Sequence, residues 1–254
     1  AIIHLRDCHN RGPITSTAGS QCIGGIVASM GASDITIEGC ANEGDLTVTS
    51  SNQRYIGGIA GSINVSSKMQ ITECYNTGDI VDISQGGYSY LGGIVGMTQN
   101  NATKLIEKCH NTGKLKGGQY TGGIVGYQNN WHYLNQVSIC YNTGSITSDG
   151  DFVGGIAGQL GRKSYITNSY NAGSIEATNP EVKGVGGIAG SNDTYGSYQE
   201  RCFNYGSISA VAKSNIGTIA GTNFSDNTHC YYLLPEDGTV FVDQNSAIGR
   251  GILS

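Results

Sequence analysis

The chain has 254 residues, of which 40 are glycine and only three are proline, and charged side chains make up 13% of it. Glycine is therefore present at about twice its usual share of ~7%, and charged residues at about half of theirs. Low charge and scarce proline are not typical of a disordered linker, and glycine without a Gly-X-Y period excludes collagen. A net charge of −5 without a long basic cluster argues against nucleic-acid binding. No apolar run approaches the ~20 residues of a membrane-spanning helix, so we expect no membrane insertion.

Two short phrases alternate along the chain. The first, Cys-x-Asn-x-Gly-x-[Ile/Leu], begins at Cys8, Cys40, Cys74, Cys109, Cys140, Ser169 and Cys202, and Cys230 begins an eighth copy that fails. The second, Gly-Gly-Ile-[Val/Ala]-Gly, begins at Gly57, Gly92, Gly122, Gly154 and Gly186, with degenerate copies at Gly24 and Gly217. Seven copies of a unit of roughly 30 residues predict a stacked repeat protein rather than a single globular core.

Each repeat contains short runs of alternating apolar and polar residues bounded by Gly, Asn, Ser and Asp, which is typical of β-strands. Ile35-Thr36-Ile37-Glu38 is one such run. No segment sustains the apolar spacing of an amphipathic helix. We therefore predict an all-β, parallel β-solenoid (β-helix) of about seven to eight coils, with about three short strands in each, over residues 1–232. Residues 233–254 are expected to cap the last coil, because an open solenoid end invites self-association.

Strand alternation assigns the repeated positions to two sides of the coil. Counted from the cysteine at position 0, the Asn at +2, the Gly at +4 and the Ile or Leu at +6 are expected to face inward. The cysteines suggest either metal or disulfide chemistry or a small buried residue at a tight corner, and we favour the latter because stacked Cβ vectors run parallel. The asparagines are expected to form a hydrogen-bonded ladder, and the glycines to supply either positive φ or close backbone approach.

The position after the cysteine is predicted to face outward and is mostly aromatic. It holds His9, Ala41, Tyr75, His110, Tyr141, Tyr170, Phe203 and Tyr231. Such a ridge can contact sugar rings or a protein partner, or it can simply stabilise the stack. A similar column, Tyr55, Tyr90, Tyr120 and Phe152, precedes the Gly-Gly-Ile phrase. The candidate ligand-binding residues are Tyr75, His110, Tyr141, Tyr170, Phe203 and Trp131, the last lying in the longest polar insert.

Catalysis has one weak candidate in the sequence. Asp45 and Asp79 fall on neighbouring coils at the +5 position, where two carboxylates ~5 Å apart can form a glycosidase pair or a weak Ca²⁺ site. A solvated edge of mixed charge is the commoner origin of such a pattern. No nucleophile, base and acid can be assembled from the repeated positions, so we expect no enzyme activity, cofactor or metal.

The two phrases together resemble the GLUG-motif repeats of bacterial surface proteins, which are also carried by IgA-cleaving metallopeptidases. The resemblance covers roughly residues 3 to 232, with departures at Ser29 and Thr218, where the family pattern has glycine. It implies an extracellular, cell-surface or secreted module with an adhesive or spacer role. It also implies flanking domains in a larger protein and a surface glycan or protein as partner. The metallopeptidase signature His-Glu-x-x-His is absent from this sequence, and the family offers no catalytic residue to transfer.

Overall fold

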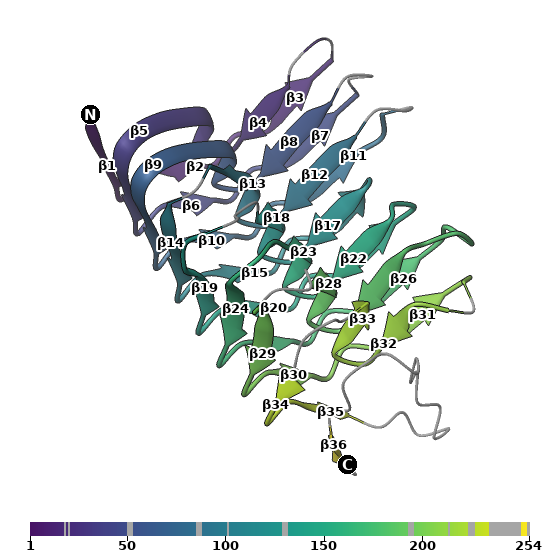
Figure 1. Cartoon of the computed structure of the whole chain (residues 1–254). Coiled ribbons are helices and arrows are strands. Elements are labelled where there is room, and N and C mark those ends of the chain that lie inside the picture. Colours follow the sequence, from purple (N-terminus) through teal and green to yellow (C-terminus); the bar gives the residue numbers. More distant parts are fainter. Residues whose placement is uncertain are drawn as a thin grey trace.

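The chain winds into a β-solenoid of about seven turns, whose strands stack in parallel rows along its length (Figure 1). The computed structural model describes residues 1–17, 19, 21–49, 53–84, 88–100, 102–128, 132–192, 196–212, 214–222, 227–233 and 250–252. Every strand pair among these residues is parallel, for example Ile14 with Leu46 and Tyr75 with His110. The all-β solenoid predicted from the repeats is confirmed. Among the residues that the structure describes, no helix has the length and apolar character needed to span a bilayer.

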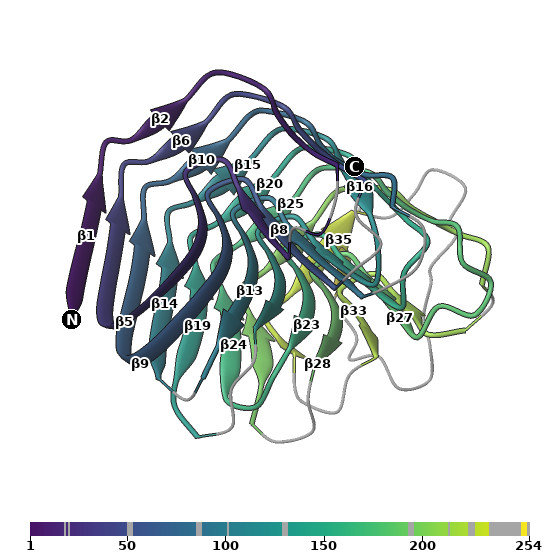
Figure 2. The same cartoon turned by 90° about the horizontal axis from the view of Figure 1, so that it is seen from above.

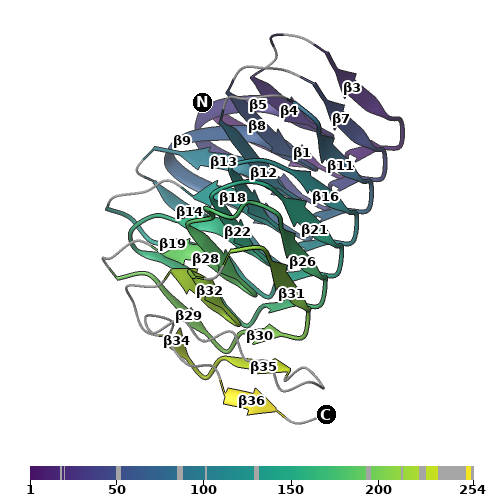
Figure 3. The ribbon, with the colours of Figure 1, turned by 90° about the vertical axis from the view of Figure 1, so that its right-hand side faces the viewer.

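Four sheets run along the solenoid, and each coil contributes more than the three short strands that we predicted, because it bends at more corners than the sequence pattern suggested (Figures 2 and 3). Sheet A contains β1 (Ile2–Arg6), β5 (Val27–Glu38), β9 (Ala60–Thr72), β13 (Val95–Gln99), β14 (Thr103–Glu107), β18 (Val125–Gln128), β19 (Asn135–Ser138), β23 (Ala157–Leu160), β24 (Ser164–Thr167), β28 (Ala189–Asn192), β29 (Tyr198–Glu200), β33 (Ala220–Thr222) and β34 (Asn227–Thr228). Sheet B contains β2 (His9–Asn10), β6 (Ala41–Asn42), β10 (Tyr75–Asn76), β15 (His110–Asn111), β20 (Tyr141–Asn142), β25 (Tyr170–Asn171), β30 (Phe203–Asn204), β35 (Tyr231–Leu233) and β36 (Arg250–Ile252).

Sheets C and D have seven strands each and lie on the other side of the coil. Sheet C contains β3 (Ile14–Ser16), β7 (Leu46–Val48), β11 (Ile80–Asp82), β16 (Leu115–Gly117), β21 (Ile146–Ser148), β26 (Ile175–Ala177) and β31 (Ile208–Ala210). Sheet D contains β4 (Cys22–Gly24), β8 (Arg54–Gly57), β12 (Ser89–Gly92), β17 (Tyr120–Gly122), β22 (Phe152–Gly154), β27 (Gly184–Gly186) and β32 (Ile216–Gly217). The long strands β5 and β9 curve through both halves of sheet A, whereas later coils divide that path between two strands, such as β13 and β14.

The side chains at the repeated positions face inward or outward as strand alternation predicts. In the fourth copy Cys109, Asn111 and Leu115 are at most 1% exposed, and the intervening His110 is half-buried on the outer face. Equivalent residues pair from coil to coil, so each inward position becomes a row parallel to the solenoid axis. Burial of these rows supplies the main driving force for stacking.

The interior is divided into two hydrophobic cores by a narrow waist. One core lies between sheets A and B and the other between sheets C and D. At the waist the Asn row meets the Gly-Gly row, so that a Cβ atom at Gly123 would lie 2.1 Å from the Gly155 carbonyl oxygen and 2.6 Å from Asn142 Cβ. The first phrase supplies the Asn row and the second supplies the Gly-Gly row, and the two phrases occur together because these rows contact each other. These glycines have no positive φ, so close backbone approach is the reason for them.

Positive φ occurs instead at the residue before the first position of each Cys-x-Asn-x-Gly copy, where the chain turns from sheet A into sheet B. This corner position is occupied by Asp7, Gly39, Glu73, Lys108, Ile139, Asn168, Arg201 and His229, with φ between 50° and 62°. The backbone at the corner is hydrogen-bonded to the next coil, as in Lys108 N to Ser138 O at 3.1 Å. The corner conformation is thus imposed by the coil geometry and not by a residue type.

The predicted capping segment, 233–254, lies mostly outside the described residues. Its described part, β36, pairs with β35 through Tyr232 and Gly251 and adds a ninth strand to sheet B.

Candidate functional site

The outward aromatic residues of sheet B form a ladder of nearly parallel rings. Tyr75 and His110 stack with centroids 5.3 Å apart and planes 9° apart, His110 and Tyr141 at 4.7 Å and 5°, and Tyr141 and Tyr170 at 5.1 Å and 4°. The spacing matches the ~4.8 Å separation of neighbouring strands. Four of the six residues predicted as a binding site are therefore brought together in one continuous stack.

Stacking changes what the ladder offers to a ligand. Each internal ring has both faces covered by its neighbours, so mainly ring edges are left toward solvent. Burial lowers the pKa of His110, which favours the neutral imidazole between the two tyrosine rings. Burial also raises the pKa of Tyr170, with smaller contributions from Tyr141 and Tyr205. Both shifts favour the uncharged forms of these two rings.

The regular stack ends at Tyr170. The next ring against it is Tyr205, which comes from the +3 position of the following coil and lies edge-on, with centroids 5.6 Å apart and planes at 69°. Phe203 packs edge-on against Tyr205 at 4.3 Å and is not stacked on Tyr170. Tyr231, one coil further, has no ring contact among the described residues. The sequence column is continuous here, but the stack is not.

A second aromatic ladder lies on sheet D. Tyr90 and Tyr120 stack at 4.7 Å with planes 2° apart, and Tyr55 and Phe152 extend the stack at its two ends. Tyr127 from sheet A packs against Tyr90 and Tyr120 at 5.9 and 5.5 Å. This ladder shows that stacked rings recur on this solenoid as stabilising elements.

The cysteine row is structural in its contacts. All eight cysteines of the chain are free, and six of them are buried. The single thiol hydrogen of Cys109 is shared between the backbone carbonyls of Glu107 and Ile71, which lie 3.2 and 3.6 Å from Sγ. Burial raises the pKa of this thiol well above the usual value. Among the described residues, no group of three or more His, Cys, Asp or Glu side chains is placed to hold a metal ion.

The asparagine row forms the predicted ladder. Asn142 Nδ2 donates both to Gly144 O in its own coil and to Asn171 Oδ1 in the next, each at 2.8 Å. Its Oδ1 accepts from Asn111 Nδ2 at 2.8 Å. Both hydrogens of the Asn142 amide are therefore hydrogen-bonded. The row fixes the spacing between neighbouring coils at the waist.

The carboxylates of Asp45 and Asp79 hold backbone amides of the neighbouring coil. Asp45 Oδ1 accepts from Asp79 N at 2.9 Å, and Asp79 Oδ1 accepts from Lys114 N at 2.8 Å. One oxygen of each carboxylate is occupied by this pattern, which gives the pair a structural explanation.

One buried ion pair and one buried lysine are absent from the sequence-based candidates. Arg54 Nε lies 3.0 Å from Asp82 Oδ2, both side chains are at most 3% exposed, and Ser89 Oγ donates to the same carboxylate at 2.6 Å. Lys104 is 1% exposed in sheet A, and burial lowers its pKa to about 7. Neither group recurs from coil to coil, so a search for repeated columns does not detect them. Trp131, the sixth predicted site residue, lies outside the described residues.

Comparison with known proteins gives a likeness of fold. No family model matches the sequence, and no curated protein matches it. Among solved structures, a protein described as a putative immunoglobulin A1 protease from Bacteroides ovatus is similar, with a TM-score of 0.56 and 18% sequence identity. The match covers 89% of this chain and 78% of that one. At this identity the likeness shows the β-solenoid fold alone.

Proposed function

We propose that this chain is a non-enzymatic module of the bacterial cell surface or of a secreted protein, which spaces neighbouring domains and presents a binding face. The observation that carries the proposal is the continuity of the sheets: sheets C and D each keep their register through seven strands. At ~4.8 Å per coil, seven such strands give a rod roughly 35 Å long. A rod whose every coil is hydrogen-bonded to the next suits a stiff spacer.

The contacts of the conspicuous polar residues support a role without catalysis. The cysteine, asparagine and aspartate positions that suggest chemistry in the sequence are engaged in bonds that join one coil to the next. The extracellular setting is taken from the GLUG resemblance, and the similar Bacteroides ovatus structure, described as a putative immunoglobulin A1 protease, fits the link of that resemblance to IgA-cleaving proteins.

The binding face that we propose is the outer side of sheet B. It carries the ring edges of the ladder residues Tyr75, His110, Tyr141 and Tyr170, flanked by exposed +3 side chains such as Thr112 and Thr143. A ridge of this kind suits contact along its length with a protein or a glycan surface. Stacking of single sugar rings is less suited to it, because the internal ring faces are covered.

Adhesion under flow tests the binding face. Beads that carry the intact chain should be retained on at least one of a panel of immobilised glycans and extracellular proteins. The double variant Thr112→Lys, Thr143→Lys places two charges on the face and should abolish retention. The matched pair Ser174→Lys, Ser209→Lys, exposed beside and on sheet C, should leave it unchanged. Absence of retention, or equal effects of the two pairs, would contradict the proposal.

Pulling the chain by its two ends tests the spacer role. The folded length should persist until coils are lost in discrete steps, since each coil is bonded only to its neighbours. Smooth extension at low force, as for a random coil, would argue against a spacer. Cleavage of any glycan or protein of the same panel by the intact chain would overturn the non-enzymatic assignment if the double variant Asp45→Asn, Asp79→Asn no longer forms the product.

A further inference from the structure

A hollow lies where the strands of sheet C end and the connections to sheet D begin. Its volume is about 410 Å³, within the ~300–1,000 Å³ that is usual for sites of small ligands. Its lining includes Asp82, Ile83, Lys116, Gly117 and Asp149, which belong to three successive coils. The hollow is therefore a feature of one place on the solenoid and does not recur with the repeat.

The hollow forms beside a coil whose connection from sheet C to sheet D is short. Only Gly118 and Gln119 join β16 to β17, whereas residues 83–88 join β11 to β12 and residues 178–183 join β26 to β27. Glycine makes the short path possible, because a Cβ atom at Gly118 would lie 2.5 Å from Ser89 Cβ. The outline of the solenoid therefore recedes at this coil.

The short connection also interrupts the row of hydrogen bonds that ends sheet C. At the other steps, the residue after a strand donates its backbone N–H to the last strand residue of the preceding coil, at 2.9 to 3.1 Å: Thr49 to Ser16, Ile83 to Val48, Thr178 to Ser148 and Val211 to Ala177. The equivalent bonds beside β16, from Gly118 N to Asp82 O and from Asp149 N to Gly117 O, are not formed between these described residues. Asp82 and Gly117 are buried, where an unmade backbone hydrogen bond costs free energy.

Two side chains of opposite charge stand unpaired at the same hollow. Lys116 and Asp149 are both exposed, and neither side chain has an ion pair or hydrogen bond within the part of the chain that the structure describes. The carboxylate of Asp82, by contrast, is engaged by Arg54 Nε at 3.0 Å and Ser89 Oγ at 2.6 Å. The charges left for a ligand are therefore one ammonium and one carboxylate.

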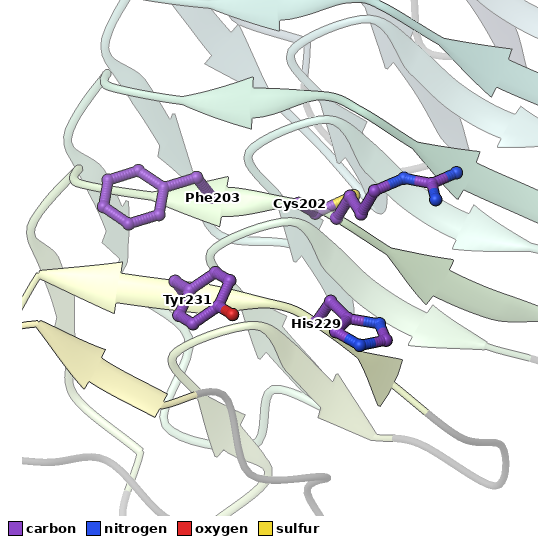
Figure 4. Close-up of a pocket in the computed structure, with 5 residues that line it drawn as sticks. Cys202, Phe203, His229 and Tyr231 are labelled. Atoms are coloured by element: carbon purple, nitrogen blue, oxygen red, sulfur yellow. The ribbon is translucent and has the colours of Figure 1, made fainter.

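The hollow beside Phe203 and Tyr231, at the end of sheet B, lacks this arrangement (Figure 4). Its arginine is held away from the two rings, since Arg201 Nε donates to Asn168 Oδ1 at 2.9 Å and Nη1 lies 3.2 Å from Glu200 Oε1. Unpaired groups of both signs surround one space at the hollow of sheet C.

Charge and hydrogen-bonding capacity restrict the ligand of that hollow. A simple anion is repelled by Asp149 and a simple cation by Lys116, whereas a ligand that carries both charges is attracted by both side chains. A carboxylate suits the Lys116 ammonium and the free N–H of Asp149. An ammonium group suits the Asp149 carboxylate and the free carbonyl groups of Asp82 and Gly117. The Ile83 side chain, 51% exposed in the lining, suits an aliphatic group.

We propose that this hollow binds a free amino acid in its zwitterionic form, with an aliphatic side chain. The carboxylate of the ligand lies at Lys116, its ammonium group at Asp149 and its side chain against Ile83. The site lies at the end of sheet C and not on the outer side of sheet B, so the inference goes beyond the proposed function and does not depend on it.

Three compounds that differ by one charge test the proposal. Binding of L-leucine, N-acetyl-L-leucine and L-leucinamide to the intact chain would be measured by NMR titration at pH 6, where each derivative keeps its single charge. We expect leucine to bind about fivefold more tightly than either derivative, the upper end for an ion pair at an exposed site. A derivative that binds as tightly as leucine, or no binding of leucine, would overturn the proposal.

Variants assign each charge of the ligand to one side chain. Lys116→Gln should remove the preference for leucine over leucinamide and keep the preference over N-acetyl-leucine, whereas Asp149→Asn should do the reverse. Lys114→Gln and Asp7→Asn are the matched controls, because both positions are exposed and lie outside the hollow. Thermal unfolding would confirm that each variant is folded. Equal effects of Lys116→Gln on both preferences would contradict the assignment.

Two further results locate the site and separate free amino acids from peptides. Addition of leucine should shift the backbone amide signals of Gly118 and Asp149 and leave that of His110 on sheet B unchanged. Unchanged signals at Gly118 and Asp149 would refute the hollow as the site. Tighter binding of glycyl-leucine than of leucine would assign the hollow to peptide ends and would overturn the amino-acid class.

Discussion

Single residues at the corner before sheet B carry backbone strain that differs from coil to coil. Ile139 has φ of 54° and is 49% exposed, although β-branched residues rarely adopt this conformation. Asn168 occupies the same position one coil later with φ of 50°, and asparagine tolerates it well.

Exchanging these two residue types should shift stability in opposite directions. Ile139→Asn should raise the free energy of unfolding by about 1 kcal/mol, and Asn168→Ile should lower it by a similar amount, since the left-handed region costs an ordinary residue ~1–2 kcal/mol. Urea unfolding of the two variants checks both signs. A loss of stability in Ile139→Asn would show that packing of Ile139 outweighs the strain.

Lys104 should make stability depend on pH. The folded-state pKa is about 7, against 10.5 for an unperturbed lysine, so between these values the unfolded state binds a proton that the folded state lacks. The free energy of unfolding should therefore rise with pH across this window, by up to about 1.4 kcal/mol per pH unit. The destabilisation that the buried Lys104 causes should be fully present below pH 7.

Replacing the buried lysine tests this dependence. Lys104→Met copies Met69, which pairs with Lys104 from the preceding coil, and should remove this part of the slope while raising stability near pH 7. Lys116→Met, at an exposed position, is the control and should keep the slope. Parallel pH profiles for wild type and Lys104→Met would refute the assignment.

At the scale of secondary structure, the waist between the two cores has the least tolerance for added atoms. Gly123→Ala should destabilise the chain by about 3 kcal/mol or prevent folding, because its Cβ would meet the Gly155 carbonyl oxygen at 2.1 Å. Gly31→Ala is the control, since its Cβ would lie 3.8 Å from Asn64 O, and should change stability by less than about 1 kcal/mol. Thermal unfolding compares the two, and similar losses would contradict a special role of the waist.

The strands and their inward rows can be predicted from the sequence. The positive-φ corners and the end of the aromatic ladder on sheet B cannot. The +2 and +6 positions, held by Asn142 and Ile146 in one copy, have the same residue types, Asn and Ile or Leu, in all seven copies, and alternation alone places them inside. The corner cannot be found in this way, because its occupants share no side-chain property. The break after Tyr170 coincides with one residue, Tyr205, whose ring packs at a steep angle against both Tyr170 and Phe203. Contacts of residues that do not recur from copy to copy can be identified only from the structure.

At the scale of the whole molecule, the cysteines report on the integrity of the stack. With the chain folded and reducing agent removed, a thiol reagent should modify only the partly exposed Cys8 and Cys22, and the six buried cysteines should react only on unfolding. Mass spectrometry of the labelled chain counts the modified thiols. Modification of Cys74 or Cys109 in the folded state, or a disulfide between neighbouring coils, would contradict the structural role of the row.

The constancy of register from coil to coil has a consequence for how such a chain changes through evolution. A change that adds or removes one whole repeat unit adds or removes one coil of the solenoid. Because each coil contacts only the coils beside it, an inserted copy meets the same Asn, Gly and Ile partners as the one it duplicates. The reach of the module can therefore be altered in increments of ~4.8 Å without redesign of any single contact.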